Sequence, residues 1–197
     1  EETSKYPKPL YIPLSILIVM LGASRFWSGR SLWFKYIFIF SIIAIFASSF
    51  YFSYQQYQIW LKNDISKHLL PPYTGINYFI FYAFTRFFAP YLMSLAVAIL
   101  FLFSAKILNK KYEERFFEPE EYYLGALAMF LSNHPGWLFY LVFLIFVYLL
   151  IHLYSLFIVH NSSFRISPYY LWIPTAIFVI IINSWLENLS IWQLLKF

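Results

Sequence analysis

Hydrophobic residues fill six stretches of this sequence, and short polar or proline-containing segments separate them. The longest runs carry no charge: Asp, Glu, Lys and Arg are absent from 36–61, from 122–164 and from 166–186. A helix of about 20 apolar residues crosses a hydrocarbon layer of roughly 30 Å. The pattern predicts an all-α fold, a polytopic transmembrane helical bundle in one membrane-embedded domain over 1–197. The hydrophobic segments lie at 10–23, 36–57, 76–104, 119–131, 137–159 and 169–186.

The third segment, 76–104, allows two interpretations. It is long enough for one tilted helix with a kink at Pro90, because proline removes a backbone donor and clashes with the preceding turn. It also fits two short helices joined near Thr85 and Arg86. The sequence leaves both open.

The fourth segment, 119–131, is short. It begins at Pro119, a favourable first helical position, and the polar turn at 132–136 ends it. Its length is about 20 Å at a rise of 1.5 Å per residue, which is too short to cross a bilayer unaided. We expect a half-helix or a re-entrant element packed within protein, because backbone that does not span is tolerated at membrane depth only there or beside a cavity.

Composition supports a membrane location. The chain is 61% hydrophobic and 12% charged, whereas soluble domains carry about 25% charged residues. It has no cysteine, which excludes disulfides and thiolate chemistry. The lipid bilayer and other membrane-protein subunits are the expected partners. The net charge of +5 is scattered over loops, so no nucleic acid partner is predicted.

Loop charges also predict an orientation. Cytoplasmic loops of membrane proteins are enriched in Lys and Arg. If all six segments cross, the loops after the first, third and fifth lie on one side and hold eight basic residues, against five on the other. This places both termini outside the cytoplasm, in a multi-pass protein that we expect in a prokaryotic cytoplasmic membrane.

Arg86 and His134 are the candidate ligand-binding residues. A guanidinium within a hydrophobic segment is costly unless it pairs, snorkels or faces water, so Arg86 is either a ligand for an anion or lipid headgroup, or a residue in a turn or ion pair. His134 stands in a Pro-Gly turn, and the alternative to ligand binding is a structural role in that turn. His134, His152 and His160 are scattered, and no metal site or cofactor is predicted.

Two acidic residues stand in a layout that resembles prepilin peptidases, a family of polytopic intramembrane aspartyl proteases. Asp64 precedes Pro71 by seven residues, and Glu121 opens a hydrophobic helix where the family has the second Asp of a Gly-x-Gly-Asp motif. The resemblance implies that Asp64 and Glu121 form the catalytic pair. Here Glu replaces the second Asp, and both glycines of the motif are absent.

Three functions follow from these features. The leading hypothesis is a non-catalytic structural or assembly component of a membrane system, because no complete catalytic motif is present. The first alternative is a degenerate prepilin-peptidase-like protease that uses Asp64 and Glu121. The second is a lipid or small-anion binder or transporter that uses Arg86 beside the short fourth segment, since broken helices mark binding sites in transporters. None of the three implies a cofactor.

Overall fold

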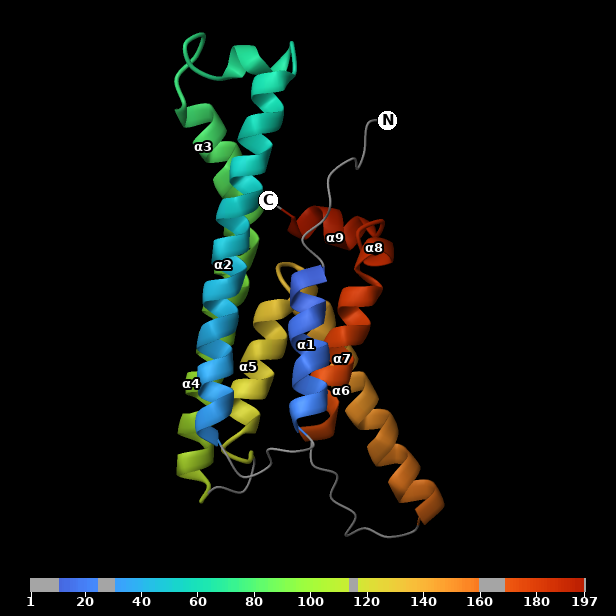
Figure 1. Cartoon of the computed structure of the whole chain (residues 1–197). Coiled ribbons are helices and arrows are strands. Elements are labelled where there is room, and N and C mark those ends of the chain that lie inside the picture. Colours follow the sequence, from blue (N-terminus) through green and yellow to red (C-terminus); the bar gives the residue numbers. More distant parts are fainter. Residues whose placement is uncertain (1–10, 25–30, 114–116, 160–168, 197) are drawn as a thin grey trace.

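The structure, a computed structural model, describes residues 11–24, 31–113, 117–159 and 169–196, and within these ranges it is helical, with no strand. Figure 1 shows the arrangement. The α-helices are α1 (Tyr11–Ser24), α2 (Ser31–Lys62), α3 (Asn77–Ala83), α4 (Ala89–Lys111), α5 (Glu121–Leu131), α6 (Gly136–Tyr154), α7 (Tyr169–Ile181), α8 (Asn183–Leu186) and α9 (Ser190–Leu195). Three further turns are η1 (Ser66–Leu69, 3-10), η2 (Phe84–Phe88, π) and η3 (Ser155–Val159, π).

A long hairpin forms one side of the molecule. α2 runs antiparallel to α3 and α4, and its tip projects beyond the other helices (Figure 1). Aromatic rings hold the hairpin together: Trp60 lies 5.3 Å from Phe79 and 4.8 Å from Tyr82, and Phe50 lies 4.8 Å from Phe88, between ring centroids. Such aromatic pairs add to the stability given by burial alone.

The third hydrophobic segment is one continuous helical run, 77–111, rather than two short helices. The π-helical turn η2 lies in it and ends two residues before Pro90, and the N–H of Ala89 donates to the carbonyl of Phe84. Proline has no N–H and its ring crowds the carbonyl four residues earlier, so a locally wider turn keeps the helix continuous. The interpretation that joins two helices near Thr85 and Arg86 is therefore not the one observed.

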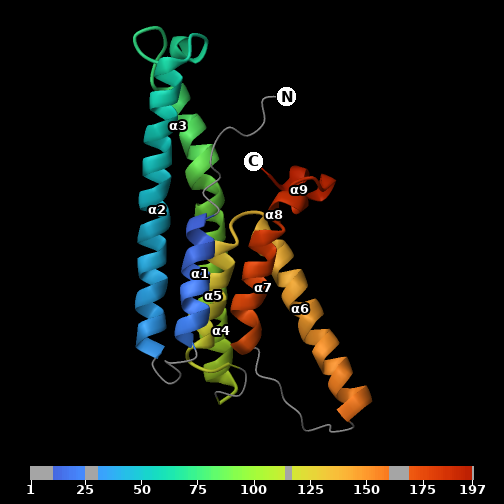
Figure 2. The same cartoon turned by 45° about the vertical axis from the view of Figure 1, so that its right-hand side comes forward.

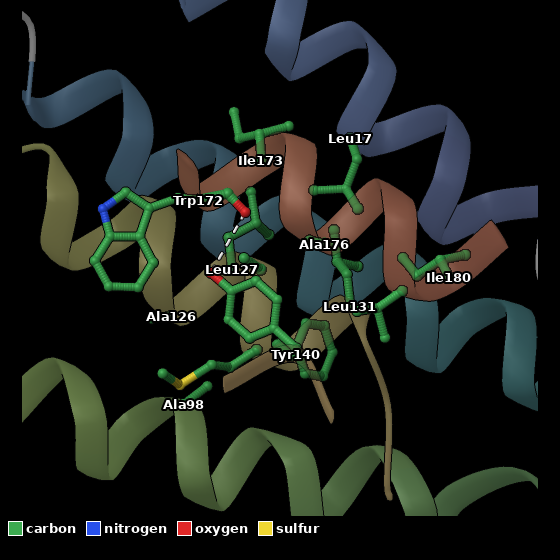
Figure 3. Close-up of a cluster of buried hydrophobic side chains, with 14 of the residues drawn as sticks. Leu17, Ala98, Ala126, Leu127, Leu131, Tyr140, Trp172, Ile173, Ala176 and Ile180 are labelled. Carbon is green, nitrogen blue, oxygen red and sulfur yellow. Dashed lines mark hydrogen bonds between the residues drawn. The ribbon is translucent and has the colours of Figure 1, made fainter. Parts of the chain in front are cut away.

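The short helix α5 lies at the centre of the bundle. It contacts α1, α2, α4, α6 and α7, and all its residues from Leu124 to Leu131 are buried. Figure 3 shows Leu127 and Leu131 of α5 packed among side chains of the neighbouring helices. This confirms the prediction that the fourth segment packs within protein.

Several helix boundaries differ from the predicted segments, and α2 begins already at Ser31. α2 and α4 extend to Lys62 and Lys111, because Gln, Asn and Lys continue a helix although they lower its hydrophobicity. α5 begins at Glu121, so Pro119 precedes the helix instead of starting it. The helix predicted over 169–186 stops at Ile181, and α8 follows as a separate turn.

By length and composition, three helical runs of the described chain are long enough to span a membrane: Leu32–Lys62, Asn77–Lys111 and Gly136–Phe157. The apolar helices α1, α5 and α7 are shorter. In the turned view of Figure 2, α6 diverges from α7 toward its C-terminal end. α1 begins, and α9 ends, at the same end of the bundle (Figures 1 and 2).

Candidate functional site

The structure does not bring Asp64 and Glu121 together. Asp64 lies in the exposed turn that follows α2, where it pairs with Lys67 at 2.6 Å. Glu121 is the first residue of α5, and the helical run 77–111, about 52 Å long at 1.5 Å per residue, separates the two positions. Two carboxyls that share a proton must lie within a few ångströms of each other. The described arrangement provides no such pair.

Glu121 instead binds the segment that precedes its own helix. Its carboxylate accepts a hydrogen bond from the N–H of Glu118 at 2.9 Å, and its side chain is 1% exposed. A carboxylate at a helix N-terminus also interacts favourably with the helix dipole. Tyr169, the first residue of α7, lies within electrostatic reach of Glu118, Glu120 and Glu121. The acidic residues and Tyr169 thus lie at one polar end of the bundle, where α5 and α7 begin.

A buried asparagine, which sequence reasoning missed, holds α4 to the segment before α5. The Asn109 Nδ2 group donates to the Phe117 carbonyl at 2.8 Å and to the Tyr122 hydroxyl, and Oδ1 accepts from the Phe117 N–H at 3.1 Å. The side chain is 1% exposed. Asn109 stands beside two lysines in the sequence, which is typical of a solvated helix end, so no local signal distinguishes it.

Replacing Asn109 by Leu should destabilise the protein strongly. The substitution removes the partners of both Phe117 backbone groups, and each buried polar group left without a partner costs about 1–3 kcal/mol. We therefore expect a loss of about 2–4 kcal/mol in the free energy of unfolding, measured by thermal or denaturant unfolding in detergent. Asn183→Leu is the matched control, because the Asn183 Nδ2 group donates a hydrogen bond to a side chain, the Glu187 carboxylate, at 3.0 Å. Equal losses in the two variants would contradict the assigned role of Asn109.

Arg86 lies in the π-helical turn η2, with its side chain exposed. Within the described residues, no carboxylate lies at ion-pair distance from its guanidinium. The ion pair considered from the sequence is therefore not observed in the part of the chain that the structure covers. The guanidinium remains available for an anion from outside the protein.

His134 is engaged by the protein at both ring nitrogens. Its Nε2 lies 2.8 Å from the carbonyl oxygen of Leu195 in α9, and the Trp137 indole N–H donates to its Nδ1 at 3.2 Å. An imidazole that accepts at Nδ1 carries its proton on Nε2, so it donates to the Leu195 carbonyl. His134 thus connects the α5–α6 turn to α9. No group of three potential metal-ligating side chains occurs among the residues that the structure describes.

An aromatic cluster surrounds Gly125 of α5. The Phe101 ring lies 5.5 Å from Trp172 and 6.3 Å from Phe117, between centroids. A Cβ atom at Gly125 would lie 2.6 Å from the Phe101 ring and 3.0 Å from the Trp172 ring. The backbone of α5 therefore approaches α4 and α7 at a distance that glycine alone allows.

No protein-family model, curated protein or solved structure matches the chain. Functional assignment therefore depends on the geometry above. That geometry gives one buried central helix, one polar end that holds the starts of α5 and α7, and one exposed arginine within a long apolar helix.

Proposed function

We propose that the chain is a multi-pass integral membrane protein whose helical bundle serves as a non-catalytic structural or assembly component of a membrane complex. The observation that carries this proposal is the exposed apolar surface of the long helices. Large hydrophobic side chains of α2, α4 and α6 are exposed along each helix, including Phe40 (65%), Leu100 (66%) and Ile145 (64%). Exposed apolar surface of this extent is favourable in lipid or against a partner.

Six alternating passes fit the helix directions. In Figures 1 and 2 successive helices alternate in direction along the series α1, α2, α4, α5, α6 and α7. The short helix α5 needs no lipid contact, because its neighbours cover it. Lys35, Lys106, Lys110 and Lys111 lie at the same end of the hairpin, and the preference of Lys and Arg for cytoplasmic loops places that end in the cytoplasm.

The C-terminal half of α6 is the surface on which assembly would occur. No residue from Ile145 to Tyr154 is buried, although Gly136, Tyr140 and Leu144 of the same helix are. The helix therefore leaves the bundle after Leu144 (Figure 2). Val147 and Ile151 are half-buried on one face, and the rest of this half of the helix is exposed to lipid and to a neighbouring transmembrane helix. Association between such helices depends on close packing, because lipid already solvates their apolar side chains.

Site-specific crosslinking in the native membrane tests the proposal. The chain has no cysteine, so single cysteines at Ile145 and Leu149 can each carry a photocrosslinker. We expect both positions to give one discrete protein adduct. Leu100, an equally exposed position on α4, is the control and should crosslink mainly to lipid. Lipid adducts alone at Ile145 and Leu149 would contradict an assembly role for α6.

A further inference from the structure

We propose that Arg86 binds the phosphate groups of lipid headgroups at one surface of the bilayer, and that the end of the α2–α3 hairpin stands outside the hydrocarbon layer. This inference rests on the proposed membrane location. It assigns Arg86 to a boundary of the membrane, although its sequence neighbours are almost all apolar.

The spacing of charges on the long helix 77–111 is the first argument. Arg86 and Lys106 bound the stretch 87–105, which contains no Asp, Glu, Lys or Arg. At 1.5 Å per residue this stretch is about 28 Å long, close to the roughly 30 Å of a bilayer's hydrocarbon core. If Lys106 lies at one headgroup layer, Arg86 lies at the other.

The partner helix α2 shares one of these boundaries. The rings of Phe50 and Phe88 lie 4.8 Å apart, so Arg86 lies near the level of Tyr51 and Phe52 on the antiparallel helix. The α2 residues from 36 to that level are uncharged, and Lys35 precedes them. The uncharged stretch of α2 continues past this level to Leu61, so α2 marks by charge only the boundary at Lys35.

On α2, the residues beyond this level are more polar than those before it, whereas Ile80 and Phe81 of α3 are apolar and exposed. Tyr51 and Tyr54 are 58% and 62% exposed, and tyrosine is enriched at the headgroup level of membrane proteins. Gln55, Gln56 and Gln58 follow in α2, and the hairpin ends in a polar turn. The hydrophobicity of α2 thus decreases at the level of Arg86.

Helix α9 marks the same surface on the other side of the bundle. In both views it lies crosswise to the long helices, at the level where α3 gives way to α4 (Figures 1 and 2). It buries Trp192 against Phe139, with ring centroids 5.3 Å apart, and exposes Ile191 and Leu194. A short helix with this orientation and these exposed side chains fits the plane of a headgroup layer.

The chemistry of Arg86 suits a phosphate. Its guanidinium is exposed and has no carboxylate partner among the described residues. A guanidinium is always charged and can bind phosphate oxygens with two parallel N–H groups. A lipid phosphate at the membrane surface also relieves the cost of placing this charge next to the apolar residues that follow it.

Spin-label depth measurement tests the position of Arg86. Single cysteines at Phe84, Ala96 and Ile107, all exposed, are labelled in phosphatidylcholine–phosphatidylglycerol vesicles, which leaves Arg86 intact. Ala96 lies midway between Arg86 and Lys106, so its label should lie at the bilayer centre, about 18 Å along the helix from the label at Phe84. Labels at Phe84 and Ile107 should lie at opposite headgroup layers. A Phe84 label as deep as that at Ala96 would overturn the inference and leave the membrane location intact. A water-exposed label at Ala96 would overturn both.

The number of phospholipids that the extracted protein retains tests whether lipid is the ligand of Arg86. We expect native mass spectrometry of the detergent-extracted protein to show one bound phospholipid fewer for Arg86→Gln than for the unsubstituted chain. Arg86→Lys should retain part of the binding, and Lys62→Gln, a charge removal at the hairpin tip, should retain all of it. Unchanged lipid retention in Arg86→Gln would overturn the assignment. Displacement of the lipid by inorganic phosphate would also overturn it, because the site would then select a free anion.

Discussion

Replacing Phe130 by Ala should give the largest loss of stability of any single truncation in the central helix. Phe130 is fully buried in α5, and its ring contacts Phe38 of α2 and Tyr91 of α4, at centroid distances of 6.4 and 6.0 Å. Its carbonyl also accepts a hydrogen bond from Ser94 at 3.1 Å. Truncation of a buried Phe costs about 3–5 kcal/mol in soluble proteins. In a membrane the transfer part of this cost is smaller, so we expect a loss of at least about 2 kcal/mol.

Phe103→Ala is the matched control for this prediction. Phe103 lies on α4 and is 59% exposed, so it faces lipid in the proposed bilayer. Removing its ring creates no internal cavity, and the change in free energy should stay within about 0.5 kcal/mol, as is usual for surface positions. Unfolding by a graded denaturant in mixed micelles compares the two variants directly. A loss for Phe103→Ala as large as that for Phe130→Ala would place α4, rather than α5, at the centre of the bundle.

The hydrophobic pattern predicted the helices of this fold but not their arrangement. Each of the six predicted segments contains a described α-helix, because long apolar runs have few other stable conformations in lipid. The segment limits were less accurate. Hydrophobicity marks the part of a helix that suits lipid, whereas α2 and α4 extend several residues further on helix-forming polar side chains.

The central position of α5 had one signal in the sequence, its short length. Side chains that face lipid and side chains that face protein are equally apolar in a membrane, so composition does not separate Phe130 from Phe103. The tertiary contacts of Asn109 and His134 had no local signal at all. For Arg86, the sequence revealed a charge within a hydrophobic segment and offered two explanations, an anion or headgroup ligand on the one hand and a turn or ion pair on the other. The length of the continuous helix supplied its distance from Lys106 and hence the proposed position at a membrane surface.

Replacing Gly125 by Ala should destabilise the bundle, although alanine favours helix formation. An added Cβ would lie 2.6 Å from Cε1 of Phe101 and 3.0 Å from Cζ3 of Trp172, and these rings are packed against each other. Overpacking of this kind costs about 1–3 kcal/mol, more than the roughly 0.5–1 kcal/mol that alanine gains over glycine in a helix. Gly22→Ala is the control, and its expected change in stability has the opposite sign. Nothing lies within 4 Å of its added Cβ, so that variant should be slightly more stable.

A double-mutant cycle with Phe101 identifies the cause of the Gly125 effect. Phe101→Ala alone should destabilise the protein, because it leaves a cavity between α4, α5 and α7. In the Phe101→Ala background the Cβ added at Gly125 has room, so Gly125→Ala should cost little or even stabilise the helix. The two substitutions should therefore couple by about 1–2 kcal/mol, within the usual range for residues in contact. Additive losses would mean that the Phe101 ring moves aside freely, and that close approach of α4 to α5 does not require glycine at position 125.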